Sequence, residues 1–196
     1  YITTSSKLQV GHPPGAPLYQ MLGAIFSVFA LEKENIGFTM NLMSGFSSAL
    51  TIAFMYWSIV LILLKITKAE KLTINRQLAI SGAGLVGALS FTFTDSFWFN
   101  AVEAEVYAMA TLIMAVLFYL GLRWERDMYT NRGNKWLLLI AFVIGLSFGV
   151  HFMGLLTIPA IVLIYYFKNQ EDIENDFNIK PITGFILANI MGVAIL

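Results

Sequence analysis

An apolar run at residues 36–64 constrains this chain most, because it contains no charged side chain. At about 1.5 Å per residue, a helix of that length exceeds the roughly 30 Å hydrocarbon core of a bilayer. Residues 77–94 and 106–122 are also apolar enough to cross one. Since the chain is 58% hydrophobic and only 12% charged, we predict an all-α integral membrane protein with a single transmembrane domain over residues 1–196.

Charge and cysteine content exclude several other classes. The 12 basic and 12 acidic residues give a formal net charge of zero, and they form no basic tract of the kind that follows a phosphate backbone. Nucleic acid is therefore not an expected partner, whereas membrane lipid is. The chain has no cysteine, which excludes disulfides, Cys-based zinc sites and thiol catalysis.

The basic residues between the apolar runs predict the orientation. One side of the expected spans collects eight of them, and only Lys7 and Lys33 fall on the other side. Because basic loops stay in the cytoplasm, the richer side is predicted to be cytoplasmic. The residues on that side are Lys65, Lys68, Lys71, Arg76, Arg123, Arg126, Arg132 and Lys135.

Three further segments are less regular. Residues 1–16 are polar and then broken by glycines and prolines, so a loop is expected. Residues 18–31 are apolar but short, which is typical of an interfacial or re-entrant segment. Residues 137–167 are too long for one upright span, and we favour two short helices that meet near residues 149–151 at the outer face, with a single tilted span as the alternative.

An acidic, aromatic stretch at residues 95–107 lies between two of the expected spans. Glu103 and Glu105 are two residues apart, so they converge if the backbone is extended and diverge if it is helical. The alternative is a capping box in which Asn100 caps the next helix and Glu103 completes it. Trp98 and Tyr107 could form the wall of a sugar site, or belong to an interfacial aromatic belt.

The two histidines, His12 and His151, are both expected on the outer face, near these acids. Histidines with carboxylates nearby could ligate a metal or bind a phosphate leaving group, although no metal-ligand spacing is present. Lys7 is another cation expected on that face. Alternatively, each histidine hydrogen-bonds a backbone carbonyl and Lys7 is a solvated loop residue, with no functional role for any of them.

Three separated segments carry a family resemblance. They are residues 7–18 (KLQVGHPPGAPL), 97–109 (FWFNAVEAEVYAM) and 145–159 (GLSFGVHFMGLLTIP). In this order they closely resemble a bacterial family of membrane proteins related to the eukaryotic protein O-mannosyltransferases. The resemblance implies the N-terminal part of a multi-helix transmembrane domain of the GT-C glycosyltransferase superfamily, so the chain is expected to be a fragment.

The resemblance also implies a reaction and roles for residues. A sugar, mannose by this resemblance, would move from a polyprenyl-phosphate donor to a Ser or Thr hydroxyl of an exported protein, at the periplasmic face of a bacterial inner membrane. Glu103 and Glu105 match the family's second acidic motif, whereas His12 and His151 stand where related enzymes have lysines near the lipid phosphate. Lys7, Trp98 and Tyr107 are expected to help bind substrate, and a divalent cation at the glutamates is a further expectation.

The same resemblance places a Trp-Asp-Cys-Gly-Glu motif directly before the equivalent of Tyr1, and the catalytic base is expected there. Two other functions are left open by the residues themselves. A carrier or flippase for a lipid or small solute would line a path through the bilayer with its acids and histidines. A structural membrane subunit would use its acids only as helix caps.

Overall fold

The computed structural model describes residues 1–11, 15–67 and 73–170 of the chain. Within these residues the fold contains helices and no strand, as predicted. The elements are α1 (Ile2–Ser6), α2 (Pro17–Val28), the 3₁₀ turn η1 (Lys33–Asn35), α3 (Ile36–Thr67), α4 (Ile74–Thr92), α5 (Asp95–Val102), α6 (Val106–Asp127), α7 (Gly133–Ser147), the 3₁₀ segment η2 (Phe152–Thr157) and α8 (Ile158–Gln170).

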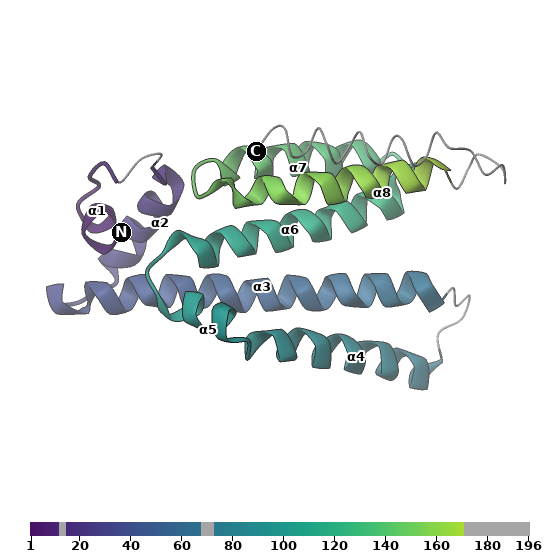
Figure 1. Cartoon of the computed structure of the whole chain (residues 1–196), viewed down its shortest axis with the longest axis horizontal. Coiled ribbons are helices and arrows are strands. Elements are labelled where there is room, and N and C mark those ends of the chain that lie inside the picture. The colour runs from purple at the N-terminus through teal and green to yellow at the C-terminus, as the bar shows by residue number, and fades with distance from the viewer. Residues whose placement is uncertain (12–14, 68–72, 171–196) are drawn as a thin grey trace.

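Two helices in the described part of the chain are long and apolar enough to cross a membrane by themselves. They are α3, which continues the turn of η1 over Lys33–Thr67, and α6. Both match predicted spans, and they pack side by side at the centre of the bundle (Figure 1). The third predicted span corresponds to α4, which qualifies only together with α5, and the two are bent by 69° at residues 93–94.

The first 16 residues are not wholly a loop, so that expectation was wrong. Residues Ile2–Ser6 form α1, in which the Thr4 and Ser6 hydroxyls donate to carbonyls three residues earlier. Ser5 is completely buried, since α1 packs on α2 where Gly23 leaves room for it. Local hydroxyl bonds and this close packing outweigh the weak helix propensity of a Thr/Ser segment.

The predicted break in residues 137–167 is confirmed. Helix α7 ends at Ser147, a turn occupies residues 148–151, and η2 leads into α8, which runs back along the bundle (Figure 1). The short apolar segment at residues 18–31 corresponds to α2, which has only 12 residues, and its interfacial or re-entrant position stays a prediction.

The helices bring the functional motifs to one end and most basic residues to the other. The first end collects α1, α2, the end of α5, the start of α6 and the 148–151 turn (Figure 1). The second end collects the C-terminal ends of α3 and α6 and the first turns of α4 and α7. Of the predicted cytoplasmic cations, Lys68 and Lys71 lie outside the described residues. The other six lie at the second end, as the orientation argument requires.

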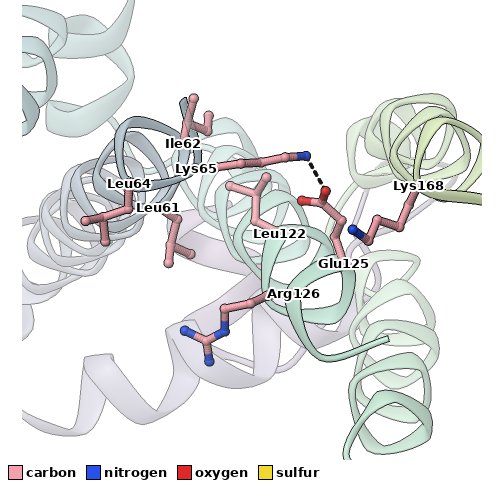
Figure 2. A pocket seen from close by; sticks show the side chains of 8 residues that line it. All are labelled: Leu61, Ile62, Leu64, Lys65, Leu122, Glu125, Arg126 and Lys168. Carbon is pink, nitrogen blue, oxygen red and sulfur yellow. Dashed lines mark hydrogen bonds and ion pairs between the residues drawn. The ribbon is translucent and has the colours of Figure 1, made fainter. Parts of the chain in front are cut away.

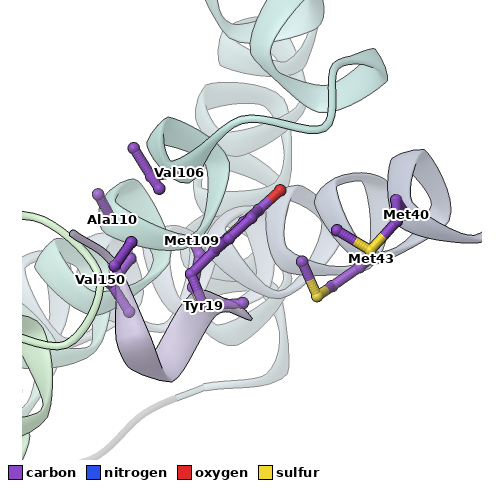
Figure 3. Close-up of a cluster of buried hydrophobic side chains, with 8 residues drawn as sticks. Tyr19, Met40, Met43, Val106, Met109, Ala110 and Val150 are labelled. Carbon is purple, nitrogen blue, oxygen red and sulfur yellow. The ribbon is translucent and has the colours of Figure 1, made fainter. Parts of the chain in front are cut away.

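A buried cluster holds the first end together. Tyr19 of α2 meets methionines of α3, one turn of α6 and Val150 of the 148–151 turn (Figure 3). Tyr19 is fully buried and its ring packs edge-on against that of Tyr1, with centroids 5.2 Å apart. The buried members are Ala16, Tyr19, Met40, Met43, Val106, Met109, Ala110 and Val150.

A polar and aromatic network joins α6 to α7 at the second end. The indole N–H of Trp136 donates to Asp127 Oδ2 at 2.9 Å, and the Arg123 guanidinium lies 4.8 Å from the centroid of the Trp136 ring. The hydrogen bond and the cation–π contact act between the same two helices. They fix the turn between α6 and α7.

We expect Trp136→Phe to lower the free energy of unfolding by about 1 kcal/mol, because it removes the N–H donor to Asp127 and keeps an aromatic ring. The thermal unfolding midpoint in detergent measures this. Trp57→Phe is the control, since Trp57 is 46% exposed and its described contacts are with other rings. Equal midpoints for the two variants would mean that the indole bond contributes nothing.

Candidate functional site

The acidic segment between α5 and α6 is a tight turn at Ala104, closed by the hydrogen bond from Glu105 N to the Glu103 carbonyl at 2.9 Å, with extended residues on either side. Glu103 has φ −109° and ψ 143°, and Glu105 has φ −126° and ψ 158°. The turn replaces the helical geometry that would point residues two apart away from each other. Both glutamates accordingly line one pocket, which is the convergent arrangement and not the helical one.

The capping-box alternative for this segment was wrong. Asn100 lies inside α5, where its side-chain amide donates to the Ser96 carbonyl at 2.9 Å. Residue 105, not residue 100, occupies the N-cap position of α6, and no side chain makes a capping bond there. With Asn100 inside α5, that helix ends at Val102, and residues 103–105 form the connection to α6.

The pocket of the two glutamates has a volume of about 400 Å³ and lies where three separate elements meet. Its walls come from α1 with the preceding Tyr1, from α3 and from the α5–α6 connection. Glu103 and Glu105 are both partly exposed, so their carboxylates are open to a ligand entering it. The lining residues are Tyr1, Ile2, Thr3, Asn41, Val102, Glu103, Ala104 and Glu105.

Tyr1 is electrostatically coupled to this acidic segment. The pKa of its phenol is raised above the ordinary value, first by burial and then by the negative charge of Glu105 and by Tyr107. A raised pKa means that the phenol keeps its proton well into alkaline solution. Tyr1 therefore faces the glutamate pocket as a hydrogen-bond donor.

Tyr107 links the acidic segment to His151. The two rings lie 5.4 Å apart between centroids, and Tyr107 follows Glu105 by two residues. His151 Nδ1 accepts a hydrogen bond from the Met153 backbone N–H at 3.1 Å. Because one ring nitrogen of a neutral imidazole is an acceptor and the other a donor, the proton lies on Nε2. His151 can thus donate a hydrogen bond from Nε2 beside Tyr107.

The N-terminal motif is joined to the same region through the backbone. The Gly149 carbonyl accepts from Leu18 N at 2.7 Å and from Tyr19 N at 3.2 Å. Ala16, just before α2, is buried in the cluster that contains Val150. Segments that are more than 100 residues apart in the sequence therefore lie side by side.

The remaining predicted site residues are placed differently. Trp98 is 55% exposed and lines apolar hollows beside α5, not the glutamate pocket. Asp95 lies with Trp98 at the start of α5. Lys7 is exposed at the end of α1 and is not part of the lining of the glutamate pocket. His12 lies outside the described residues.

The sequence matches one family over residues 1–174, described as the protein O-mannosyl-transferase TMEM260 N-terminal domain. The chain belongs to this family. The TMEM260 relatives include the protein O-mannosyl-transferase of Dictyostelium discoideum, which is 23% identical over 98% of this chain and 23% of its own length. The TMEM260 protein O-mannosyl-transferase of Mus musculus is 25% identical over 74% of this chain and 18% of its own.

The chain thus spans less than a quarter of the length of these curated TMEM260 relatives. No solved structure matches it significantly. The family agrees with the resemblance of the three motifs to protein O-mannosyltransferases. It also places the glutamate pocket within the N-terminal domain of that family.

Sequence reasoning missed Tyr1, Thr3 and Asn41 in this TMEM260-family domain. Asn41 did carry a signal, because it is the one side-chain amide within the apolar run 36–64, and polar groups inside a span commonly face a cavity. Thr3 carried none, since α1 was not expected, and Tyr1 carried one only through the resemblance, which places a catalytic motif directly before it. Their place in the pocket follows from the packing of α1.

The described side chains offer few ligands for a metal ion. The described part of the chain contains no group of three or more His, Asp or Glu side chains placed to hold an ion. Two glutamates alone are a sparse set for a resident divalent cation, which usually binds six or more oxygen ligands, waters included. A cation at Glu103 and Glu105 stays a prediction, and no step below depends on one.

Proposed function

We propose that this chain forms part of the active site of a membrane glycosyltransferase. In this proposal a sugar, mannose, passes from a polyprenyl-phosphate donor to a Ser or Thr hydroxyl of an exported protein. The single observation that carries it is the gathering of Glu103, Glu105, Tyr107 and His151 at one end of the helices. The names of the relatives, which are protein O-mannosyl-transferases, support the same reaction class.

The reaction needs a proton acceptor and a site for the departing phosphate. The acceptor hydroxyl attacks the anomeric carbon, the bond from that carbon to the phosphate oxygen breaks, and the hydroxyl proton moves to a carboxylate. Glu103 and Glu105 are open carboxylates in one pocket and orient the hydroxyl in this proposal. We leave the base itself unassigned, because the resemblance places it in a motif before Tyr1.

In this proposal the departing phosphate is bound by hydrogen-bond donors beside Tyr107, away from the two glutamates. The Nε2–H of His151 is a neutral donor for a phosphate oxygen, and Tyr107 is 43% exposed beside it. A neutral donor binds phosphate less strongly than an ammonium does. His12 would supply a further contact to the phosphate, as the resemblance implies, and Lys7 would help bind substrate.

The membrane setting in this proposal is the inner membrane of a bacterium, with the pocket on the periplasmic face. The basic end of the helices supports that orientation, since basic ends stay in the cytoplasm. The carrier alternative fits less well. In the described helices the apolar segments 36–64, 77–94 and 106–122 contain no Asp, Glu or His that could line a path between the two faces.

The test uses the full-length protein reconstituted with mannosyl-phosphoryl-polyprenol and a peptide with a single Ser. We expect the peptide to gain the mass of one hexose, and the same peptide with Ala in place of Ser to gain none. Mass spectrometry of the peptide measures this. Movement of the donor lipid between leaflets without any peptide product would instead support the flippase and overturn the proposal.

A further inference from the structure

A second pocket lies at the opposite end of the helices from Glu103 and Glu105. It has a volume of about 390 Å³ and is formed by the C-terminal turns of α3, α6 and α8. Figure 2 shows the Lys65 ammonium joined to the Glu125 carboxylate, with Lys168 reaching toward the same carboxylate and Arg126 extending the other way. The lining residues are Leu61, Ile62, Leu64, Lys65, Leu122, Glu125, Arg126 and Lys168.

At this pocket the acidic side chains are covered and the basic side chains paired with them are exposed. Glu125 has only 10% of its side chain exposed, whereas the Lys65 side chain that pairs with it is 58% exposed. The pair of Arg126 with Asp127 repeats the arrangement, with 54% of the arginine exposed and 13% of the aspartate. In both pairs the acid is covered and the cation reaches solvent, so the surface offered to a ligand is cationic.

The rest of the wall is apolar. Leu61, Ile62, Leu64 and Leu122 come from the segments of α3 and α6 that lie just inside the basic end. A ligand that fits must therefore carry an anion at one end and a hydrocarbon body beside it. Among membrane components, an anionic phospholipid has this shape, and basic pockets between transmembrane helices bind such head groups.

We propose that this pocket binds an anionic phospholipid from the leaflet at the basic end, with its phosphate against Lys65 and Lys168, which reach toward one another's side of the pocket. The acyl chains lie along Leu61, Leu64 and Leu122. The covered Glu125 carboxylate holds these two lysines in place, because both reach toward it and an acid beneath an exposed cation fixes the direction of its side chain. The lipid thus ties α3 to α8 at the end opposite the proposed active site, independently of the reaction.

The test compares lipid retention by the full-length protein in nanodiscs of phosphatidylcholine that contain one part in five of phosphatidylglycerol. Native mass spectrometry after mild detergent extraction counts the retained lipids. We expect wild type to keep phosphatidylglycerol in preference to phosphatidylcholine. Lys65→Gln/Lys168→Gln should lose this preference by roughly 25-fold, at about fivefold for each cation removed.

Two further variants separate this pocket from general surface charge. Arg132→Gln/Lys135→Gln removes two exposed cations at the same end but outside the pocket, and it should change the preference less than twofold. Leu122→Trp fills the hollow without changing charge and should also lose the retained lipid. Equal loss in both double variants, or full retention with Trp at position 122, would overturn the proposal.

Discussion

In the full-length protein, Glu103→Gln/Glu105→Gln is expected to lower the rate of sugar transfer by about 100-fold or more while leaving the amount of folded protein unchanged. Both carboxylates face the same pocket, so one can partly replace the other in a single variant. Gln keeps the size and polarity of Glu but loses the negative charge, so its neutral oxygen holds the acceptor hydroxyl less strongly than a carboxylate does. Transfer to a Ser peptide, measured at saturating donor, gives the rate.

The matched control is Glu32→Gln/Glu34→Gln, which removes the same number of charges from exposed positions on the same side of the protein, outside the pocket. This variant is expected to transfer sugar at the wild-type rate. A double variant of Glu103 and Glu105 that retains full activity would remove both residues from the mechanism. An equal loss of sugar transfer in the control variant would mean that the lower rate comes from surface charge alone.

Much of the fold could be predicted because the bilayer sets the length of its helices. The run 36–64 and the run 106–122 each became one helix, since a charge-free segment of that length has no other stable form in lipid. The length of residues 137–167, too great for one upright span, correctly indicated a break. The sequence did not indicate α1, whose Thr and Ser residues have weak helix propensity and are held by packing on α2.

The candidate site was harder to predict than the spans. Spacing left Glu103 and Glu105 open between convergence and capping, and the answer depends on the helix boundaries, since α5 contains Asn100 and α6 begins only after Glu105. Proximity of His151 to Tyr107 depends on the turn at residues 148–151, a long-range contact that no local pattern encodes. The three similar motifs supplied that grouping only as an expectation, whereas the packing of α2 on the turn gives it a physical cause.

Gly149→Ala is expected to separate α2 from this turn. A Cβ at residue 149 would lie 2.7 Å from Leu18 Cβ, 3.3 Å from the Leu146 carbonyl oxygen and 3.4 Å from Leu18 N. These are atoms of the backbone or fixed to it, so they cannot rotate away as the end of a flexible side chain would. The hydrogen bonds from Leu18 N and Tyr19 N to the Gly149 carbonyl would lengthen as α2 moves.

We therefore expect Gly149→Ala to lower the free energy of unfolding by about 1–3 kcal/mol and to reduce sugar transfer, because Tyr19 also supports Tyr1 at the glutamate pocket. The thermal unfolding midpoint and the peptide assay measure the two effects. Gly145→Ala is the control one turn earlier, where an added Cβ meets nothing within 4 Å. It should leave stability unchanged or raise it by up to about 1 kcal/mol, as alanine favours a helix. Equal midpoints at the two positions would mean that α2 does not depend on this contact, and the pocket would then need another explanation for its shape.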